Sequence, residues 1–378
     1  MIKILHTGDI HLDSAFSGLD SRHAEIRRNE LRAAFTSMMT YARAGGVDLL
    51  LIAGDLFDGD YITRETLALL TREFERFEKP VFIAPGNHDP ASADSVWVRN
   101  SGSRNIFPPN VHIFRENTLS SVDLPDLPVT VYGFGFTENE LPFVPIEGNT
   151  VADPSRVNLL VCHCDMLGMK SSAKDCPVTA AHLDAFGADY AALGHIHNPP
   201  SPGHDGRWCY CGCLEARAFD ETGPKGACIV EIDKNGTSSG VTVKRVRFSK
   251  RRYEKGELAL TGLSTQADVR EAIRSYLAEH RLGEDTLLSL RLTGVVAQSL
   301  VIDTEALEND PCGLFLLRVE DATLPDIDVD ALENDITITG ELYRALKPSI
   351  ESEDKRTREV GIRAFRYALS ALAGEKTF

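Results

Sequence analysis

The sequence predicts an α/β fold: a two-sheet sandwich flanked by helices, followed by a small α+β module and a C-terminal helix. Three observations lead to this prediction. Residues 1–89 alternate strand-like and helix-like segments, which is typical of βαβ units and a largely parallel sheet. After Asn87, short strand-like runs separated by turn residues replace that alternation. The pattern changes again near residue 252, which indicates a domain boundary.

The two helices of the first segment have recognisable ends. The first is expected from Arg22 to Ala44, where the pair Gly45-Gly46 stops it. The second is expected from Thr63 to Phe77 and is closed off by Pro80. The apolar runs before and between these helices are typical of buried strands.

The short strands after Asn87 are expected to form two packed sheets together with the first strands, because helical patterning is sparse there. The expected strands are Val111–Phe114, Val129–Phe134, Val157–Cys162, Tyr190–Leu193, Trp208–Cys211, Ala227–Ile232 and Val241–Phe248.

The chain is expected to divide into three parts, which are residues 1–252, 253–340 and 341–378. In the second part, an amphipathic helix over residues 266–281 precedes strands at 286–293 and 314–319. Alternating β-branched residues predict a further strand at 335–339. This part is expected to be a small α+β capping module.

The C-terminal part is expected to be helical over residues 355–373. Its apolar residues recur at helical spacing and form one stripe, made of Ile362, Phe365, Leu369 and Leu372. The stripe either packs onto its own domain or docks onto a helix of a partner protein. The sequence leaves both alternatives open.

The charge of the chain restricts its partners. With 40 basic and 56 acidic residues, its net charge is −16. A protein that grips nucleic acid unaided needs many phosphate contacts, so either DNA is not the substrate, or a partner helps, or the basic residues are local. One local cluster consists of Lys244, Arg245, Arg247, Lys250, Arg251 and Arg252. It is either a solvated strand edge and linker or a contact for substrate phosphates.

Membrane and disulfide-rich classes do not fit. No window approaches the roughly 18 apolar residues of a membrane helix, and the early His6 and Asp9 do not suit a signal peptide, so a cytoplasmic protein is expected. The eight cysteines include Cys162/Cys164 and Cys209/Cys211/Cys213. They are either small buried residues or a second metal or redox site, although the spacing differs from that of structural zinc sites.

Polar side chains follow five of the expected strands. The residues concerned are Asp9, His11, Asp55, Asn87, His163, His195 and His197. In α/β sheets, ligands gather outside the carboxyl ends of the strands, so these side chains are expected to converge on one point. That convergence predicts a metal site.

Seven ligands are too many for one closed ion and suit two divalent ions that share a carboxylate. Oxygen and imidazole ligands favour Mn²⁺, with Fe or Zn²⁺ as alternatives. Two ions about 3.5–4 Å apart can clamp the attacking and leaving oxygens of a phosphoryl displacement. His88, next to Asn87, is left over. It could stabilise the transition state or protonate the leaving oxygen, with its ring oriented by Asp89.

The ordered motifs D-x-H, G-D-x-x-D, G-N-H-D, H and G-H-x-H resemble those of the calcineurin-like metallophosphoesterase superfamily. The resemblance implies a metal-dependent hydrolase with a two-sheet sandwich fold. By position, it assigns one ion to Asp9, His11 and His197. It assigns the other ion to Asn87, His163 and His195. Asp55 would bridge the ions, and His88 would be the catalytic histidine.

Three segments carry a narrower resemblance, to DNA repair exonucleases of the SbcD and YhaO-like branch. They are residues 6–14, 52–58 and 219–226. The resemblance implies Mn²⁺, a DNA substrate and an SMC-like ATPase partner with a long coiled coil. This chain contains no G-x-x-x-x-G-K-[ST] motif, so ATP use would belong to that partner.

The leading hypothesis is therefore a two-metal-ion DNA nuclease, acting as an exonuclease in DNA repair. The alternative is a small-molecule or protein phosphoesterase on the same scaffold, which the acidic composition motivates. A non-catalytic subunit that recruits a partner through its C-terminal helix is the third. A homodimer remains open.

Overall fold

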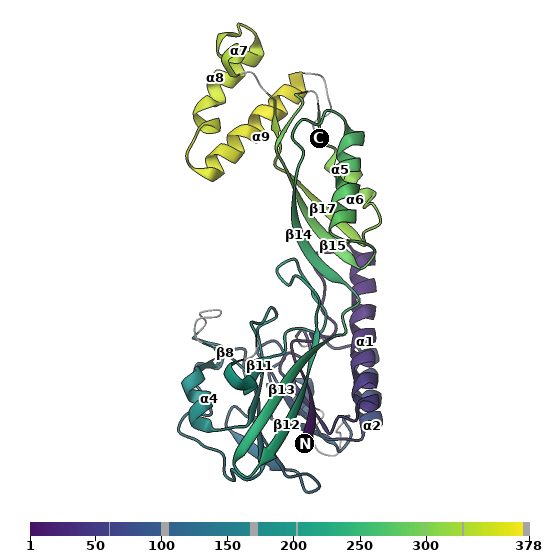
Figure 1. The fold of residues 1–378 in the computed structure, drawn as a ribbon, viewed down its shortest axis with the longest axis vertical. Helices are drawn as coiled ribbons and strands as arrows, with labels where there is room; N and C mark the ends of the chain where they lie inside the picture. Colours follow the sequence, from purple (N-terminus) through teal and green to yellow (C-terminus); the bar gives the residue numbers. More distant parts are fainter. Residues whose placement is uncertain are drawn as a thin grey trace. The chain divides into compact units, whose positions relative to one another are not determined.

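The computed structural model describes residues 1–59, 61–99, 106–166, 173–201, 203–298, 300–326 and 329–372. The chain forms two compact units, Met1–Arg252 and Tyr253–Phe378 (Figure 1). Each unit has its own hydrophobic core.

The first unit is built on two sheets, as predicted. One has the strand order β13-β12-β1-β2-β3-β4, and the other has the order β11-β10-β7-β6-β5. The strands of the first sheet are β1 (Ile2–Thr7), β2 (Leu49–Ala53), β3 (Val81–Ala84), β4 (Val111–Ile113), β12 (Gly226–Asn235) and β13 (Ser238–Arg247). Those of the second are β5 (Ser120–Asp123), β6 (Val129–Gly133), β7 (Val157–His163), β10 (Tyr190–Gly194) and β11 (Trp208–Tyr210).

The directions of the strands matter for the site. Strands β1 to β4 run parallel to one another, and so do β6, β7, β10 and β11. The hairpin of β12 and β13 joins the first sheet antiparallel to β1. Parallel strands end at the same edge of their sheet, so β1, β2 and β3 deliver their following loops to one place, as do β7 and β10.

Both faces of β2 are buried, which explains its continuous apolar sequence. Leu50 and Ile52 pack under α1 (Ser21–Ala44) and α2 (Arg64–Phe77). The alternate residues, such as Leu51, face the second sheet instead.

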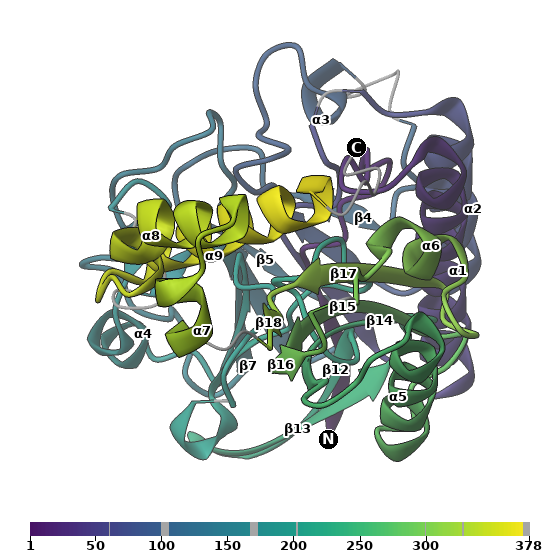
Figure 2. The same ribbon diagram turned by 90° about the horizontal axis from the view of Figure 1, so that it is seen from above.

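The helices complete the layers. Helices α1 and α2 lie side by side, and α4 (Ala180–Phe186) lies on the opposite side of the unit (Figure 1, Figure 2). The order of layers is therefore helix, sheet, sheet, helix. The short elements α3 (Val96–Arg99), β8 (Asp165–Met166), β9 (Pro177–Val178) and η2 (His204–Gly206) complete the unit.

The ends of α1 follow its sequence. The carboxylate of Asp20 accepts hydrogen bonds from the first backbone amides of the helix, and Gly45 caps its last turn. Residue Thr63, expected to be the first residue of α2, instead caps it through a hydrogen bond from the amide of Thr66.

The second unit contains a three-stranded sheet of order β14-β15-β17, with α5 and α6 on one face (Figure 1). Its strands are β14 (Arg252–Ala259), β15 (Thr286–Thr293), β16 (Val295–Val296), β17 (Leu316–Asp321) and β18 (Leu324–Pro325). Its helices are α5 (Gln266–Glu279), α6 (Thr304–Asn309), α7 (Val329–Asn334), α8 (Ile338–Ile350) and α9 (Lys355–Leu372). None of the described helices is long and apolar enough to cross a membrane.

One predicted strand is wrong. Residues 335–339 do not form a strand, because α8 begins at Ile338. The Asp335 carboxylate accepts hydrogen bonds from the amide and the hydroxyl of Thr337. This local turn competes with the alternating β-branched pattern and prevails over it.

The apolar stripe of α9 is used within the second unit. Phe365 is only 2% exposed and packs with Leu332 and Tyr343. Leu369 packs against the same cluster. The structure therefore favours packing onto its own domain for these two side chains. Ala373, the expected last residue of the helix, lies outside the described residues.

The cysteines match the first of their two alternatives. Seven of the eight are buried, and the Sγ atoms of Cys162 and Cys164 lie 3.9 Å apart. Within the described residues, the side-chain groups with metal-ligand spacing contain no cysteine. The thiols act as small buried side chains.

Candidate metal centre

The ends of five strands bring the seven predicted ligands together. Asp9 follows β1, Asp55 follows β2, and Asn87 follows β3 in the first sheet. In the second sheet, His163 ends β7, and His195 follows β10. The backbone amide of His195 donates to both oxygens of Asp9, at 2.9 and 3.0 Å, which joins the two sheets at this point.

Several of these residues have an unusual backbone conformation. The φ angles are +47° at Asp9, +51° at His11, +49° at Asp55 and +106° at His195. Such angles are uncommon for residues with a side chain and persist only where the surroundings impose them. The strained turns direct the side chains inward from the strand ends.

Three glycines create the space for the ligands. A Cβ atom on Gly54 would lie 2.2 Å from the Nδ1 atom of His163. A Cβ atom on Gly86 would lie 2.2 Å from Oδ1 of Asp55, and one on Gly194 would lie 1.7 Å from the carbonyl oxygen of Ala53. The glycines of the G-D, G-N-H-D and G-H-x-H motifs are thus needed for close approach.

The first group of ligands consists of Asp9, His11, Asp55 and His197. One ligand atom from each lies within 4.8 Å of the others. The Nε2 atom of His11 lies 3.3 Å from Nε2 of His197 and 3.6 Å from Oδ2 of Asp55. The Nε2 atom of His197 lies 3.7 Å from Oδ1 of Asp9.

The hydrogen bonds of the two imidazoles show what this group can hold. The Nδ1 atom of His11 donates to Asp58 at 3.0 Å, and that of His197 donates to Glu221 at 2.6 Å. Each neutral ring therefore presents an Nε2 lone pair to the other ring and to the carboxylates. Facing lone pairs and anions repel one another, so the donor set fits a divalent cation.

The second group surrounds His163. Its Nδ1 atom donates to the carbonyl oxygen of Ala53 at 3.1 Å, which leaves Nε2 as an acceptor. The Nε2 atom lies 2.9 Å from Oδ1 of Asn87, 3.2 Å from Nδ1 of His195 and 3.4 Å from Oδ2 of Asp55. The same Asp55 oxygen also faces His11, so it lies between the two groups, where a bridging carboxylate would lie.

The carboxylates of the centre remain ionised. Burial alone would raise the pKa of Asp55, but positive charge on His163 and His11 lowers it to about 2. Burial alone would likewise raise the pKa of Glu221, but its hydrogen bond with His197 lowers it to about 2. The centre therefore keeps the negative charge that attracts a cation.

His88 lies at the edge of the centre. Its side chain is 49% exposed, and its Nδ1 atom lies 3.7 Å from Oδ1 of Asp58. Its ring centroid is 5.0 Å from that of His11. The backbone amide of His88 donates to Oδ1 of Asp55 at 3.0 Å, which holds the residue beside the bridging position.

The expected orienting role of Asp89 does not match the structure. Its carboxylate accepts hydrogen bonds from the backbone amides of Gly86, Leu56 and Phe57, at 2.8 to 3.2 Å. Asp89 thus ties the loop after β3 to the loop after β2. The carboxylate beside the ring of His88 is Asp58, because the chain turns between His88 and Asp89.

Sequence reasoning missed three residues around the ligands. Asp58 and Glu221 hold the Nδ1 atoms of two histidines, and Arg217 lies between them. Its Nη1 atom donates to Asp58 at 2.9 Å, and its Nη2 atom lies 3.8 Å from Glu221. Asp58 and Glu221 both belong to motifs noted in the sequence, which could have signalled them, whereas Arg217 carries no such signal.

Part of the basic cluster has a structural role. Arg251 forms hydrogen bonds with the Glu30 carboxylate of α1, and the backbone amide of Lys250 donates to Glu215. Arg245 donates to the carbonyl oxygens of Cys211 and Tyr210. These residues brace the loops around β11 and α1.

The fold and the ligand geometry together define a metallophosphoesterase. Residues 2–199 of the 378-residue chain match the family model described as calcineurin-like phosphoesterase, and the chain belongs to this family. The resemblance drawn from the motifs is thereby confirmed.

The curated relatives come from the expected branch. The chain is 28% identical to the uncharacterized metallophosphoesterase YhaO of Bacillus subtilis (strain 168), over 88% of this chain and 77% of the relative. It is 26% identical to the DNA double-strand break repair protein Mre11 of Halobacterium salinarum, over 96% and 86%. It is 24% identical to the SbcD component of the nuclease SbcCD of Staphylococcus epidermidis, over 62% and 67%.

Proposed function

We propose that this chain is a two-metal-ion DNA nuclease, acting as an exonuclease in DNA repair, with Mn²⁺ as its metal. One observation carries the proposal. Two groups of nitrogen and oxygen atoms share Oδ2 of Asp55, which lies 3.6 Å from Nε2 of His11 and 3.4 Å from Nε2 of His163. Two ions bound there would supply a water nucleophile and neutralise charge on the scissile phosphate.

The residues of the chain have separate tasks in this proposal. Asp9, His11 and His197 hold one ion, Asn87, His163 and His195 hold the other, and Asp55 bridges them. His88 faces the centre from its exposed edge and donates a proton to the leaving oxygen. Asp58, 3.7 Å from Nδ1 of His88, keeps that ring charged and oriented.

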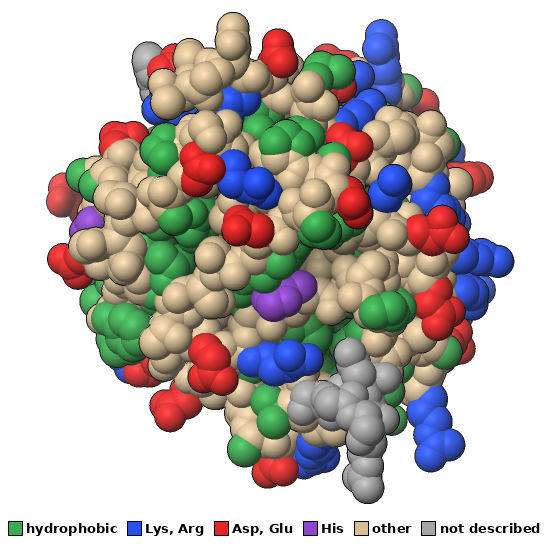
Figure 3. All heavy atoms as spheres, turned by 90° about the horizontal axis from the view of Figure 1, so that it is seen from below, with side chains coloured by type: hydrophobic (Ala, Val, Ile, Leu, Met, Phe, Trp, Pro, Cys, Tyr) green, Lys and Arg blue, Asp and Glu red, His purple; other side chains and the backbone are tan. Residues whose placement is uncertain are grey.

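The substrate assignment is supported by the relatives. Two of them are named as a DNA double-strand break repair protein and as part of a nuclease. The net charge of −16 favours a partner that supplies part of the grip on DNA. On the face drawn in Figure 3, acidic and basic side chains alternate, and the described residues form no continuous basic surface. An SMC-like coiled-coil ATPase is the proposed partner, and a homodimer remains a prediction.

The second unit is proposed to serve substrate capping and partner docking. The side chains of Val360 and Tyr367 on α9 are both 60% exposed, although the helix buries Phe365. These exposed apolar side chains give a partner helix a surface to pack against.

The test is a Mn²⁺-dependent nuclease assay on single- and double-stranded DNA. We expect release of nucleotides, lost in Asp55→Ala and reduced at least 100-fold in His88→Ala. The exposed histidine of the second unit, His280, provides the control variant His280→Ala, which should keep full activity. DNA cleavage that survives both site substitutions would contradict the proposal.

A phosphoesterase acting on small molecules or proteins is the second candidate, because the chain is acidic. It would be favoured if the chain hydrolysed a chromogenic phosphoester but left DNA intact, even with a coiled-coil ATPase partner present. Since an unpartnered nuclease core could also hydrolyse the small ester, the assay with the partner decides between the two.

A further inference from the structure

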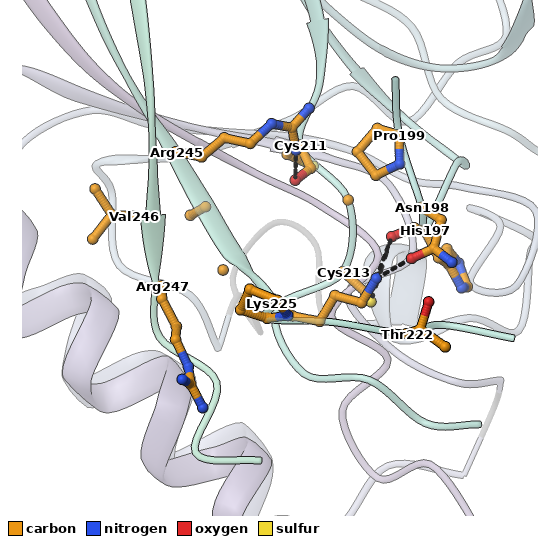
Figure 4. Close-up of a pocket in the computed structure, with 14 residues that line it drawn as sticks. His197, Asn198, Pro199, Cys211, Cys213, Thr222, Lys225, Arg245, Val246 and Arg247 are labelled. Carbon is orange, nitrogen blue, oxygen red and sulfur yellow. Dashed lines mark hydrogen bonds between the residues drawn. The ribbon is translucent and has the colours of Figure 1, made fainter. Parts of the chain in front are cut away.

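A cavity of about 480 Å³ lies beside the candidate metal centre (Figure 4). His197 and Asn198 form one wall, and the end of β13 forms the opposite wall. The described residues that line it include Lys225, Arg245 and Arg247 but no Asp or Glu. Three basic side chains without a carboxylate are unexpected in a chain with 16 more acidic than basic residues.

Lys225 is the central observation. Its side chain is 7% exposed, and its ammonium group donates to the carbonyl oxygen of His197 at 3.2 Å and to the side-chain oxygen of Asn198 (Figure 4). Both acceptors are uncharged. Within the part of the chain that the structure describes, no carboxylate pairs with this ammonium group. A buried charge without a counter-charge is costly, which favours an anionic ligand.

The backbone holds the two guanidinium groups of the cavity wall. Arg245 donates to the carbonyl oxygens of Tyr210 and Cys211, at 2.8 and 3.0 Å. Arg247 donates to the carbonyl oxygen of Ser249 at 3.0 Å. The carbonyl oxygens fix the guanidinium group of Arg245 in place but carry no formal charge of their own, so together with Lys225 it gives the cavity a positive potential.

Glu221, the carboxylate in the loop before Lys225, is engaged elsewhere. It accepts hydrogen bonds from His197 and from the backbone amide of Arg217, both at 2.6 Å. The loop thus places its carboxylate behind the metal ligand and its ammonium group in the cavity. An anion in the cavity would lie next to His197 without touching the carboxylates of the metal centre.

We propose that this cavity is an anion site that receives a phosphate of the substrate strand next to the phosphate being hydrolysed. The inference rests on the nuclease function proposed above, because only a strand with several phosphates can occupy the cavity and the metal centre together. Its ligand is a nucleic-acid backbone, bound through charge and without reference to base identity.

Binding in EDTA tests the site without turnover. A short single-stranded oligothymidylate and inorganic phosphate would each be titrated into the metal-free protein by calorimetry. We expect Lys225→Gln to weaken oligothymidylate binding roughly 10-fold and to lower the slope of its salt dependence by about one phosphate contact. Lys225→Arg, which keeps the charge, should retain most of the affinity.

The matched control is Lys244→Gln. Lys244 is exposed on β13, carries the same charge and does not line the cavity. We expect it to bind oligothymidylate as the wild type does. Equal weakening in Lys225→Gln and Lys244→Gln would reflect overall charge and would overturn the proposal.

Two further outcomes would also overturn it. If Lys225→Gln lowers Mn²⁺ affinity and leaves oligothymidylate binding unchanged, Lys225 only braces the His197 loop. If inorganic phosphate binds as tightly as oligothymidylate, the cavity holds a single phosphate and no strand. Failure of the nuclease function is separate, because a chain that binds the strand through Lys225 in EDTA but never cleaves DNA with Mn²⁺ would contradict only that function.

Discussion

Asp58 shows how much one side chain can organise at the residue scale. Its carboxylate accepts from Nδ1 of His11 at 3.0 Å and from Arg217 at 2.9 Å, and it lies 3.7 Å from Nδ1 of His88. Burial alone would raise the pKa of Asp58, but the hydrogen bond from His11 and the charge of Arg217 lower it below its usual range. An ionised Asp58 therefore links a metal ligand to the candidate proton donor.

Arg217 is expected to position two metal ligands through their carboxylate partners. Replacing it in Arg217→Met removes the cation between Asp58 and Glu221, so the rings of His11 and His197 lose their fixed orientation. We expect the affinity for one of two Mn²⁺ ions to fall about 10- to 100-fold, as measured by calorimetric titration. The exposed Arg207 provides the control Arg207→Met. Two ions bound with unchanged affinity in Arg217→Met would contradict this role.

His6 predicts a pH dependence of stability. It is fully buried on β1, with Nδ1 2.7 Å from the Tyr190 hydroxyl, and burial, aided by Arg245, lowers its pKa from 6.5 to about 3. Below pH 6.5 the unfolded chain binds a proton that the folded chain excludes. Its contribution to stability is therefore complete above pH 6.5 and is lost toward pH 3, at about 1.4 kcal/mol per pH unit.

Urea unfolding of the metal-free protein between pH 6 and pH 4.5 measures this slope. In His6→Gln the slope should decrease by about 1.4 kcal/mol per unit, whatever the absolute stability of the variant. An unchanged slope would mean that His6 is protonated in the folded protein or that other groups govern this range.

At the scale of elements, Gly54 sets the spacing between β2 and β7. It has a φ of +84°, and an added Cβ would lie 2.2 Å from Nδ1 of His163. We expect Gly54→Ala to displace His163 and to lower Mn²⁺ affinity at least 10-fold. Gly148→Ala is the matched control, because Gly148 has a φ of +73° but no neighbour within 4 Å of the added atom. It should cost only about 1 kcal/mol of backbone strain and no metal affinity.

Helix α9 allows its two expected roles to be separated. Phe365 is 2% exposed in the core with Tyr343, whereas Tyr367 is 60% exposed on the same helix. Phe365→Asp should destabilise the second unit by about 3–5 kcal/mol, as measured by thermal unfolding. Tyr367→Asp should leave stability within about 0.5 kcal/mol. If α9 docks a partner, Tyr367→Asp should weaken the complex, and an unchanged complex would argue against docking through this face.

The elements and the ligands could be predicted from the sequence for different reasons. The strands and α1 follow hydrophobic periodicity, which tertiary packing reinforces. The seven ligands follow short motifs at strand ends. The strand expected at residues 335–339 failed because an Asp335 side chain captured the local backbone. Arg217 was missed because it lies 159 residues from Asp58 in sequence, and only the packed fold brings them together.

At the scale of the whole molecule, the metal centre is shared between two sheets. Asp9, Asp55 and Asn87 come from the strands of one sheet, and His163 and His195 come from those of the other. Ions that bind both groups stabilise the folded first unit by mass action, since the unfolded chain does not assemble the site. The second unit has its own core, so its stability should not respond to the metal.

Calorimetric scans in EDTA and in Mn²⁺ test this expectation. At a metal concentration 100 times Kd, the stabilisation is about 2.7 kcal/mol, which corresponds to a rise of roughly 5–10 °C in the unfolding temperature of the first unit. The transition of the second unit should stay in place, and Asp55→Asn should abolish the rise because it removes the charge shared by both groups. A rise in both transitions would mean that the units unfold together, and no rise in either would mean that the seven side chains do not bind the ions as a set.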